Sequence, residues 1–126
     1  MAETIEDIIL DHDARGMLSL RPHLPSDYCS QAARYVMNHP GDVIIVTGFY
    51  ILMAGGPETD GPPGAIAIGK ALQALGRRVT YVSDQYTTPV LQAWADDADI
   101  IDFPIADIPE SKQQAASILD RLRPSL

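Results

Sequence analysis

Apolar and polar positions along the chain alternate between helix-like and strand-like patterns. Apolar residues at helical spacing predict five helices, over residues 4–16, 26–38, 62–75, from 89 onward, and 109–122. Short β-branched runs predict strands over residues 42–47, 78–82 and 100–103. The first of these runs does not alternate, which is typical of a strand buried on both faces. Strand and helix follow each other in turn. We therefore expect an α/β fold of three layers, with a mostly parallel sheet and flanking helices.

Local signals predict where several elements begin and end. Thr4, with Asp7 three residues later, predicts a capped start for the first helix, and Gly16 predicts its end. Two prolines predict a loop over residues 21–25. The last helix runs into Arg-Pro-Ser-Leu, so we expect a further strand to start at Leu126 in a longer relative. The sheet of three strands is then expected to be incomplete.

Composition narrows the class of protein. The 126 residues suit one domain, and 46% are hydrophobic, which is enough for a core. A net charge of -8 repels phosphate backbones, so we expect no nucleic-acid partner. The N-terminus is acidic and lacks a secretory pattern, and the apolar runs are too short to span a bilayer. We therefore expect a cytoplasmic protein with no membrane partner. A single cysteine, Cys29, excludes an intrachain disulfide.

The loop between the first strand and the third helix carries the candidate chemistry. It runs from Gly48 to Gly61, whereas βα loops usually have about 2–6 residues, and longer ones are often functional. Its glycines allow a ligand to approach the backbone closely. The helix that follows could hold an anion at its N-terminus. Glu58 and Asp60 could converge on a divalent cation. Alternatively, Asp60 is only the N-cap of the helix and Glu58 is solvated.

The residues around this loop resemble a known family. Val46-Thr47-Gly48-Phe49 precedes Pro57-Glu58-Thr59-Asp60-Gly61-Pro62-Pro63-Gly64-Ala65, and Val79-Thr80-Tyr81-Val82-Ser83-Asp84 follows. Together with Leu10-Asp11-His12-Asp13-Ala14-Arg15-Gly16-Met17, these strings resemble the D-glutamate cyclase-like domain over nearly the whole chain. The resemblance implies interconversion of D-glutamate and 5-oxo-D-proline by loss or gain of water. It also implies a divalent metal in some members.

The resemblance also implies that these residues are part of a longer domain. Domains of this family are about twice as long as this sequence, so residues 1–126 are expected to be the N-terminal part of a single domain. Part of the active site is then expected to lie outside these residues. We therefore expect the 126-residue chain alone to be much less active than a longer relative, or inactive.

Three sets of residues are candidates for the site. A cofactor, Mg²⁺ or Mn²⁺, is assigned to Glu58 and Asp60 as oxygen ligands. Substrate binding is assigned to backbone and hydroxyl groups at the strand end and the helix start, namely Thr47, Gly48, Gly61 and Gly64. The catalytic candidates are Asp84, Arg15 and His12.

Each catalytic candidate has a structural alternative. Asp84 follows a strand end, where a carboxylate could take or return protons, but it could equally form a turn. Arg15 could bind the substrate α-carboxylate in a bidentate pair, and His12 could act as a general base. Alternatively, both residues belong to a solvated helix end.

Two other functions compete with the cyclase. One is metal-dependent hydrolysis of a small phosphorylated metabolite, with phosphate at the helix N-terminus. The other is a non-catalytic fragment that needs a partner or the missing C-terminal half. The apolar stretch at residues 50–53 favours some contact surface, and the protein could form a homo-oligomer. In both enzymatic interpretations the partner is a small-molecule substrate.

Overall fold

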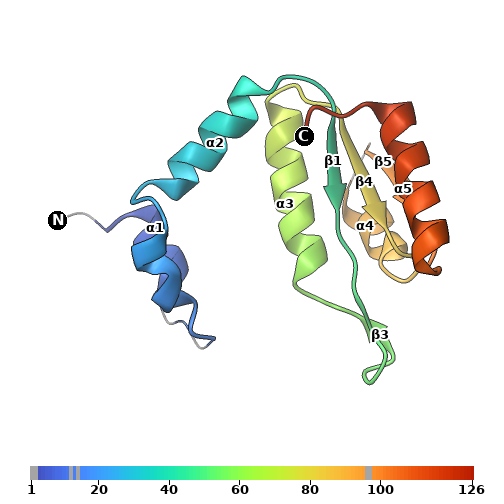
Figure 1. Cartoon of the computed structure of the whole chain (residues 1–126), viewed down its shortest axis with the longest axis horizontal. Coiled ribbons are helices and arrows are strands. Elements are labelled where there is room, and N and C mark those ends of the chain that lie inside the picture. The colour runs from blue at the N-terminus through green and yellow to red at the C-terminus, as the bar shows by residue number, and fades with distance from the viewer. Residues whose placement is uncertain (1–2, 12, 14, 96–97) are drawn as a thin grey trace. The chain divides into compact units, whose positions relative to one another are not determined.

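The computed structural model describes residues 3–11, 13, 15–95 and 98–126. Figure 1 shows these residues in sequence order, coloured from the N-terminus to the C-terminus. The chain divides into two compact units, Met1–His39 and Pro40–Leu126. In the described residues, the first unit contains helices and no strand, and the second unit contains all the strands.

The first unit contains α1 (Ile5–Leu10), a 3-10 helix (Met17–His23) and α2 (Tyr28–Asn38). The predicted capping box is confirmed, because Thr4 Oγ1 accepts from Asp7 N at 3.2 Å and the Asp7 carboxylate accepts from Thr4 N at 3.1 Å. The second predicted helix is also confirmed, with Asp27 at its N-cap.

Two predicted boundaries in this unit are wrong. The first helix ends at Leu10 and not at Gly16, because the Asp13 carboxylate accepts from the backbone N–H groups of Arg15 and Leu18 and turns the chain. Gly16, with φ of +79°, precedes the 3-10 helix instead. Much of the loop predicted over residues 21–25 belongs to that 3-10 helix, since proline is tolerated in such short turns.

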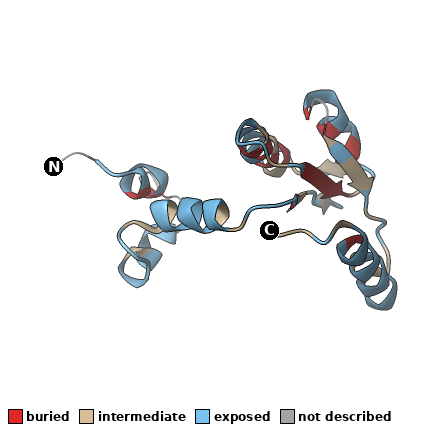
Figure 2. Ribbon diagram, turned by 90° about the horizontal axis from the view of Figure 1, so that it is seen from above, coloured by how far each residue is buried: buried red, intermediate tan, exposed pale blue. Residues whose placement is uncertain are grey.

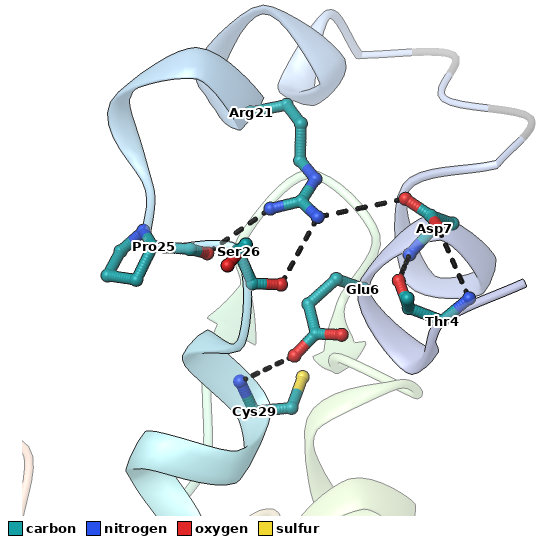
Figure 3. A network of polar contacts seen from close by, with 7 residues as sticks. All are labelled: Thr4, Glu6, Asp7, Arg21, Pro25, Ser26 and Cys29. Carbon is teal, nitrogen blue, oxygen red and sulfur yellow. Dashed lines mark hydrogen bonds and ion pairs between the residues drawn. The ribbon is translucent and has the colours of Figure 1, made fainter.

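Two side chains connect the segments of this unit, as Figure 3 shows. The Arg21 guanidinium donates to the backbone oxygens of Pro25 at 3.2 Å and Ser26 at 3.3 Å, and lies 3.7 Å from the Asp7 carboxylate. Glu6, on α1, is buried and accepts from the backbone N of Cys29 at 3.0 Å, near the start of α2. The Glu6 carboxylate therefore joins the two α-helices of the unit.

The second unit is an α/β structure, as predicted. Its elements are β1 (Val43–Val46), β2 (Tyr50–Ile51), β3 (Gly56–Pro57), α3 (Gly61–Ala74), β4 (Val79–Ser83), α4 (Thr88–Trp94), β5 (Asp99–Asp102) and α5 (Ile108–Leu122). The predicted strands and helices of this half are confirmed to within one or two residues. The segment with β2 and β3 is the exception.

The main sheet has the strand order β1-β4-β5, and both pairings are parallel. Val46 is opposite Val82, and Ser83 is opposite Asp102. Each crossover contains one helix, α3 between β1 and β4 and α4 between β4 and β5. The carboxyl ends of the strands therefore meet at one edge, where α/β proteins bind ligands.

The predicted three layers are confirmed. Viewed from above, α5 lies on the opposite side of the sheet from α3 and α4 (Figure 2). Residues of α5, including Ile118, share an apolar cavity with Val46 and Val82 of the sheet. On the other face, Gly69 of α3 packs directly on Tyr81 of β4.

The core of this unit is centred on β4. All five of its residues are buried, and Leu91 of α4 is fully buried beside the sheet. The prediction that β1 is buried on both faces is wrong. Val43 is buried, but Ile44 and Ile45 are half-buried and Val46 is 76% exposed. The reason is topological, since β1 pairs with only one strand of the sheet.

The segment predicted as a loop from Gly48 to Gly61 contains a small antiparallel hairpin. Tyr50 is opposite Pro57 and Ile51 is opposite Gly56. Its turn closes because Gly55, at φ of +65°, donates its backbone N–H to Ile51 O at 2.9 Å. The hairpin extends past the carboxyl ends of the sheet strands (Figure 1).

The last residues lie along the outer edge of β1. Ser125 N donates to Asp42 O at 2.8 Å, and Ile44 N donates to Leu126 O at 2.9 Å. Ser125 Oγ also donates to Asp42 O at 3.2 Å. No helix in the described part of the chain is long and apolar enough to cross a membrane.

Candidate functional site

The candidate site lies at the carboxyl ends of β1 and β4. Thr47 N donates to Val82 O at 3.1 Å, which continues the parallel ladder one step beyond β1. Thr47 and Gly48 therefore lie beside Ser83 and Asp84. A pocket of about 280 Å³ opens there, and the segment after β5, which includes Phe103, forms another wall. The structure thus places two predicted substrate-binding residues beside a predicted catalytic residue.

Gly48 makes the closest approach in the site. A Cβ at this position would lie 2.4 Å from Asp84 Oδ2 and 2.9 Å from Ser83 Oγ. Its φ of +125° is also a conformation that residues with side chains rarely adopt. A larger residue would displace one of these polar groups, so glycine is needed here for steric as well as conformational reasons.

Asp84 is held firmly by the start of α4. Its Oδ1 accepts from Tyr86 N at 2.9 Å and Thr87 N at 3.1 Å, and its Oδ2 accepts from Thr87 Oγ1 at 3.1 Å. The turn-forming alternative is therefore correct. It is compatible with a role at the site, because Oδ2 also faces Gly48 and can accept a further hydrogen bond.

The hairpin returns Glu58 to the strand end. Glu58 N donates to Phe49 O at 2.8 Å, directly after the β2–β3 pairing. A Cβ on Gly61 would lie 3.1 Å from Thr47 Oγ1 and 3.6 Å from Glu58 Oε2. Thr47, Glu58 and Gly61 therefore converge at the N-terminus of α3.

A stacked tyrosine pair fixes the base of the hairpin. The rings of Tyr50, on β2, and Tyr86, after Asp84, are 4.1 Å apart between centroids at an interplanar angle of 29°. Such contacts contribute about 0.5–1.5 kcal/mol beyond the area they bury. The pair therefore connects the segment that carries Glu58 to the turn that carries Asp84.

Asp60 is the N-cap residue of α3, but its side chain makes no capping hydrogen bond and is exposed. Its backbone O accepts from Gly64 N at 3.5 Å. Pro62 and Pro63 have no amide hydrogen, so Gly61 supplies the remaining backbone donor of the first turn. The N-terminus of α3 is therefore a weaker anion site than its position alone suggests.

A metal ion at this end of the sheet would find hard oxygen donors. Glu58 and Thr47 offer a carboxylate and a hydroxyl around Gly61, and Mg²⁺ and Mn²⁺ prefer such ligands. Among the described residues, no group of three or more His, Cys, Asp or Glu side chains could hold a metal. A cation bound by these two residues would need its remaining ligands from water or substrate.

The other two catalytic candidates belong to the first unit. Arg15 is exposed and donates its backbone N–H to Asp13 Oδ1 at 2.9 Å. Backbone N–H groups, that of Leu18 above all, hold the pKa of Asp13 below its ordinary value. His12 lies outside the described residues. The catalytic roles of Arg15 and His12 stay predictions.

Sequence reasoning did not assign a role to Ser83. Its side chain is 2% exposed, and its Oγ has no hydrogen-bond partner among the described residues. The signal that could have found it is a hydroxyl residue directly before Asp84 at the end of a buried strand.

Comparison with known proteins gives a family match over most of the chain. The family model described as D-glutamate cyclase-like, C-terminal, matches residues 5–122. The human protein named "D-glutamate cyclase, mitochondrial" is 41% identical over 64 residues, which are 49% of this chain and 10% of that protein. The match therefore spans only a small part of this relative. No solved structure matches the chain. Since the family model covers nearly all of the sequence, the chain belongs to the D-glutamate cyclase-like, C-terminal, family.

Proposed function

We propose that this protein interconverts D-glutamate and 5-oxo-D-proline, with loss or gain of water. The observation that carries the proposal is the family match over residues 5–122, which includes both the acidic loop and the strand ends. The name of the human relative supports the same reaction class. The location of the site is supported by Asp84 beside Gly48, and by Thr47 and Glu58 beside Gly61.

The reaction needs proton transfer at a defined place. The amine nitrogen of glutamate attacks the γ-carboxyl carbon and forms the lactam C–N bond, while a carboxyl C–O bond breaks and its oxygen leaves as water. The protons that the ammonium group gives up are those that the leaving oxygen takes. We assign Asp84 to this transfer, because its hydrogen bonds hold it in place and its Oδ2 faces Gly48.

The acidic loop is assigned to the γ-carboxylate end of the substrate. A divalent cation held by Glu58 and Asp60 would polarise this carboxylate. Thr47 Oγ1 and the backbone N–H of Gly61 lie beside Glu58 and can donate hydrogen bonds there.

The phosphohydrolase alternative is less well supported by this site. Phosphate binding at a helix N-terminus relies on free backbone N–H groups, and Pro62 and Pro63 remove two of them. The described residues that line the pocket at the strand ends include no lysine or arginine to balance phosphate charge. The positively charged ammonium group of glutamate suits this lining better than a phosphate group does.

Proton NMR tests the proposal directly. D-Glutamate incubated with Mn²⁺ and a longer member of the family should develop the lactam signals of 5-oxo-D-proline, and L-glutamate should give little product. The 126-residue chain should give the same product at a much lower rate, or none. Asp84→Asn should reduce the rate by about 10²-fold or more, because general acid–base catalysis contributes about 10²–10⁴. Asp107→Asn is the matched control, since Asp107 caps α5 through Glu110 N at 2.9 Å and does not line the pocket.

Two outcomes would count against the cyclase. The first is equal turnover by wild type and Asp84→Asn, which would remove Asp84 from the chemistry. The second is absence of lactam together with phosphate release from sugar phosphates or nucleotides, which would move the assignment to the hydrolase.

A further inference from the structure

Ser83 combines burial with an unused hydrogen-bonding group. It is the last residue of β4, the central strand, and its side chain is 2% exposed. Its backbone O accepts from Phe103 N at 2.7 Å, so the carbonyl group is satisfied. Its Oγ has no partner among the described residues. A buried hydroxyl without a partner destabilises a fold. Its presence at this position therefore indicates a functional role.

The position of Ser83 supplies such a reason. The residue lines the pocket at the strand ends, and its Oγ lies 2.9 Å from where a Cβ on Gly48 would be. The other buried hydroxyl without a partner, Tyr81 Oη, contrasts with it, because that atom packs on Gly69 between helix and sheet. Among the residues that the structure describes, only Ser83 therefore combines an unsatisfied hydroxyl with a place beside Asp84.

The charge of the pocket indicates which group it would bind. Asp84 is the one charged side chain among the described lining residues, and none of them is lysine, arginine or histidine. Hydroxyl oxygens of Thr47, Ser83 and Ser111 can each accept a hydrogen bond. An ammonium group donates three hydrogen bonds and carries the complementary charge, whereas a carboxylate would be repelled by Asp84.

We infer that Ser83 is a ligand-binding residue and that this pocket takes a small molecule by its ammonium group, with Ser83 Oγ and Asp84 Oδ2 as acceptors. The choice of an amino acid as that molecule rests on the proposed function. The apolar walls, which include Val82 and Phe103, suit the methylene groups of such a ligand. In the proposed reaction this orientation places the attacking nitrogen beside the carboxylate that handles its proton.

Binding of D-glutamate and glutarate, measured by NMR titration of backbone amides, tests the orientation. The two molecules differ only in the amino group, so the wild-type protein should bind D-glutamate at least about tenfold more tightly. Ser83→Ala should lose about tenfold in affinity for D-glutamate and little for glutarate. Ser125→Ala is the matched control, because Ser125 donates its Oγ to Asp42 O at 3.2 Å and does not line this pocket.

Thermal unfolding provides the control for folding. Ser83→Ala should melt at or above the wild-type temperature, because it removes an unsatisfied buried hydroxyl. Equal affinity of wild type and Ser83→Ala for D-glutamate would overturn the inference. So would glutarate binding as tightly as D-glutamate, or no binding of D-glutamate to the wild type.

The test separates this inference from the cyclase proposal. Binding that depends on Ser83, without lactam formation, would leave the ammonium site standing and remove the cyclase reaction. Lactam formation by the wild type, together with unchanged affinity of Ser83→Ala for D-glutamate, would support the cyclase reaction and remove the ammonium site.

Discussion

Gly69→Ala is expected to destabilise the second unit strongly, although alanine is the better helix former. Gly69 is buried in the middle of α3, and a Cβ there would lie 1.8 Å from Tyr81 Oη and 2.7 Å from Tyr81 Cζ. Tyr81 is fully buried on the central strand and cannot rotate into solvent. Either the ring or the helix must therefore move.

The magnitude follows from two opposing terms. Replacing glycine by alanine inside a helix stabilises by about 1 kcal/mol. Overpacking of a core costs about 1–3 kcal/mol, and a contact as short as this one belongs at the upper end. The net expectation is a loss of about 2 kcal/mol, which for a unit of this size corresponds to a melting temperature lower by roughly 8–16 °C.

Urea unfolding followed by circular dichroism measures this difference. Gly64→Ala is the matched control, because it lies in the same helix and nothing approaches the position of its Cβ within 4 Å. It should stabilise by about 0.5–1 kcal/mol. Adding Tyr81→Phe to Gly69→Ala should restore part of the loss, since it removes the nearest atom. If Gly69→Ala is as stable as wild type, α3 and β4 cannot pack as closely at Gly69 and Tyr81 as described.

Two further predictions concern acid stability and the metal. Backbone N–H groups, first its own and then that of Cys29, hold the pKa of Glu6 below its ordinary 4.5. The stability that this carboxylate contributes is complete above pH 4.5 and is lost as the pH falls through the lower folded value. Acid titration followed by circular dichroism should show a steeper loss for wild type than for Glu6→Gln, and superimposable curves would contradict the assignment. In calorimetric titration with Mn²⁺, Glu58→Gln and Asp60→Asn should each bind at least about tenfold more weakly than wild type. Undiminished binding by Asp60→Asn would remove Asp60 as a ligand.

The sequence predicts the α/β architecture because each crossover carries a strong local signal. The β-branched runs of β1 and β4 and the Pro62-Pro63 start of α3 are visible without any tertiary information. The capping box of Thr4 and Asp7 is visible for the same reason. The first helix is harder to delimit, because the carboxylate that turns the chain belongs to Asp13, beyond the periodic segment.

The candidate site is only partly visible in the sequence. Thr47 and Asp84 follow neighbouring parallel strands, so their proximity can be inferred from the pairing of those strands. The approach of Glu58 to Thr47 depends on the β2–β3 hairpin, whose strands have two residues each and thus no periodicity to detect. The exposure of Val46 depends on strand order, which a single strand does not encode.

The hydrogen bonds between the chain end and β1 have a consequence for the order of folding. The sheet pairs Val43 with Val79 and Thr80 with Asp99, so each strand reaches its neighbour across a single helix. The contact of Ser125 with Asp42 joins positions 83 residues apart. Loop-closure entropy rises with chain separation, so this contact should form after the three strands have assembled. Pulse-labelled hydrogen exchange during refolding should therefore find the amide of Ser125 protected later than the amides of β4.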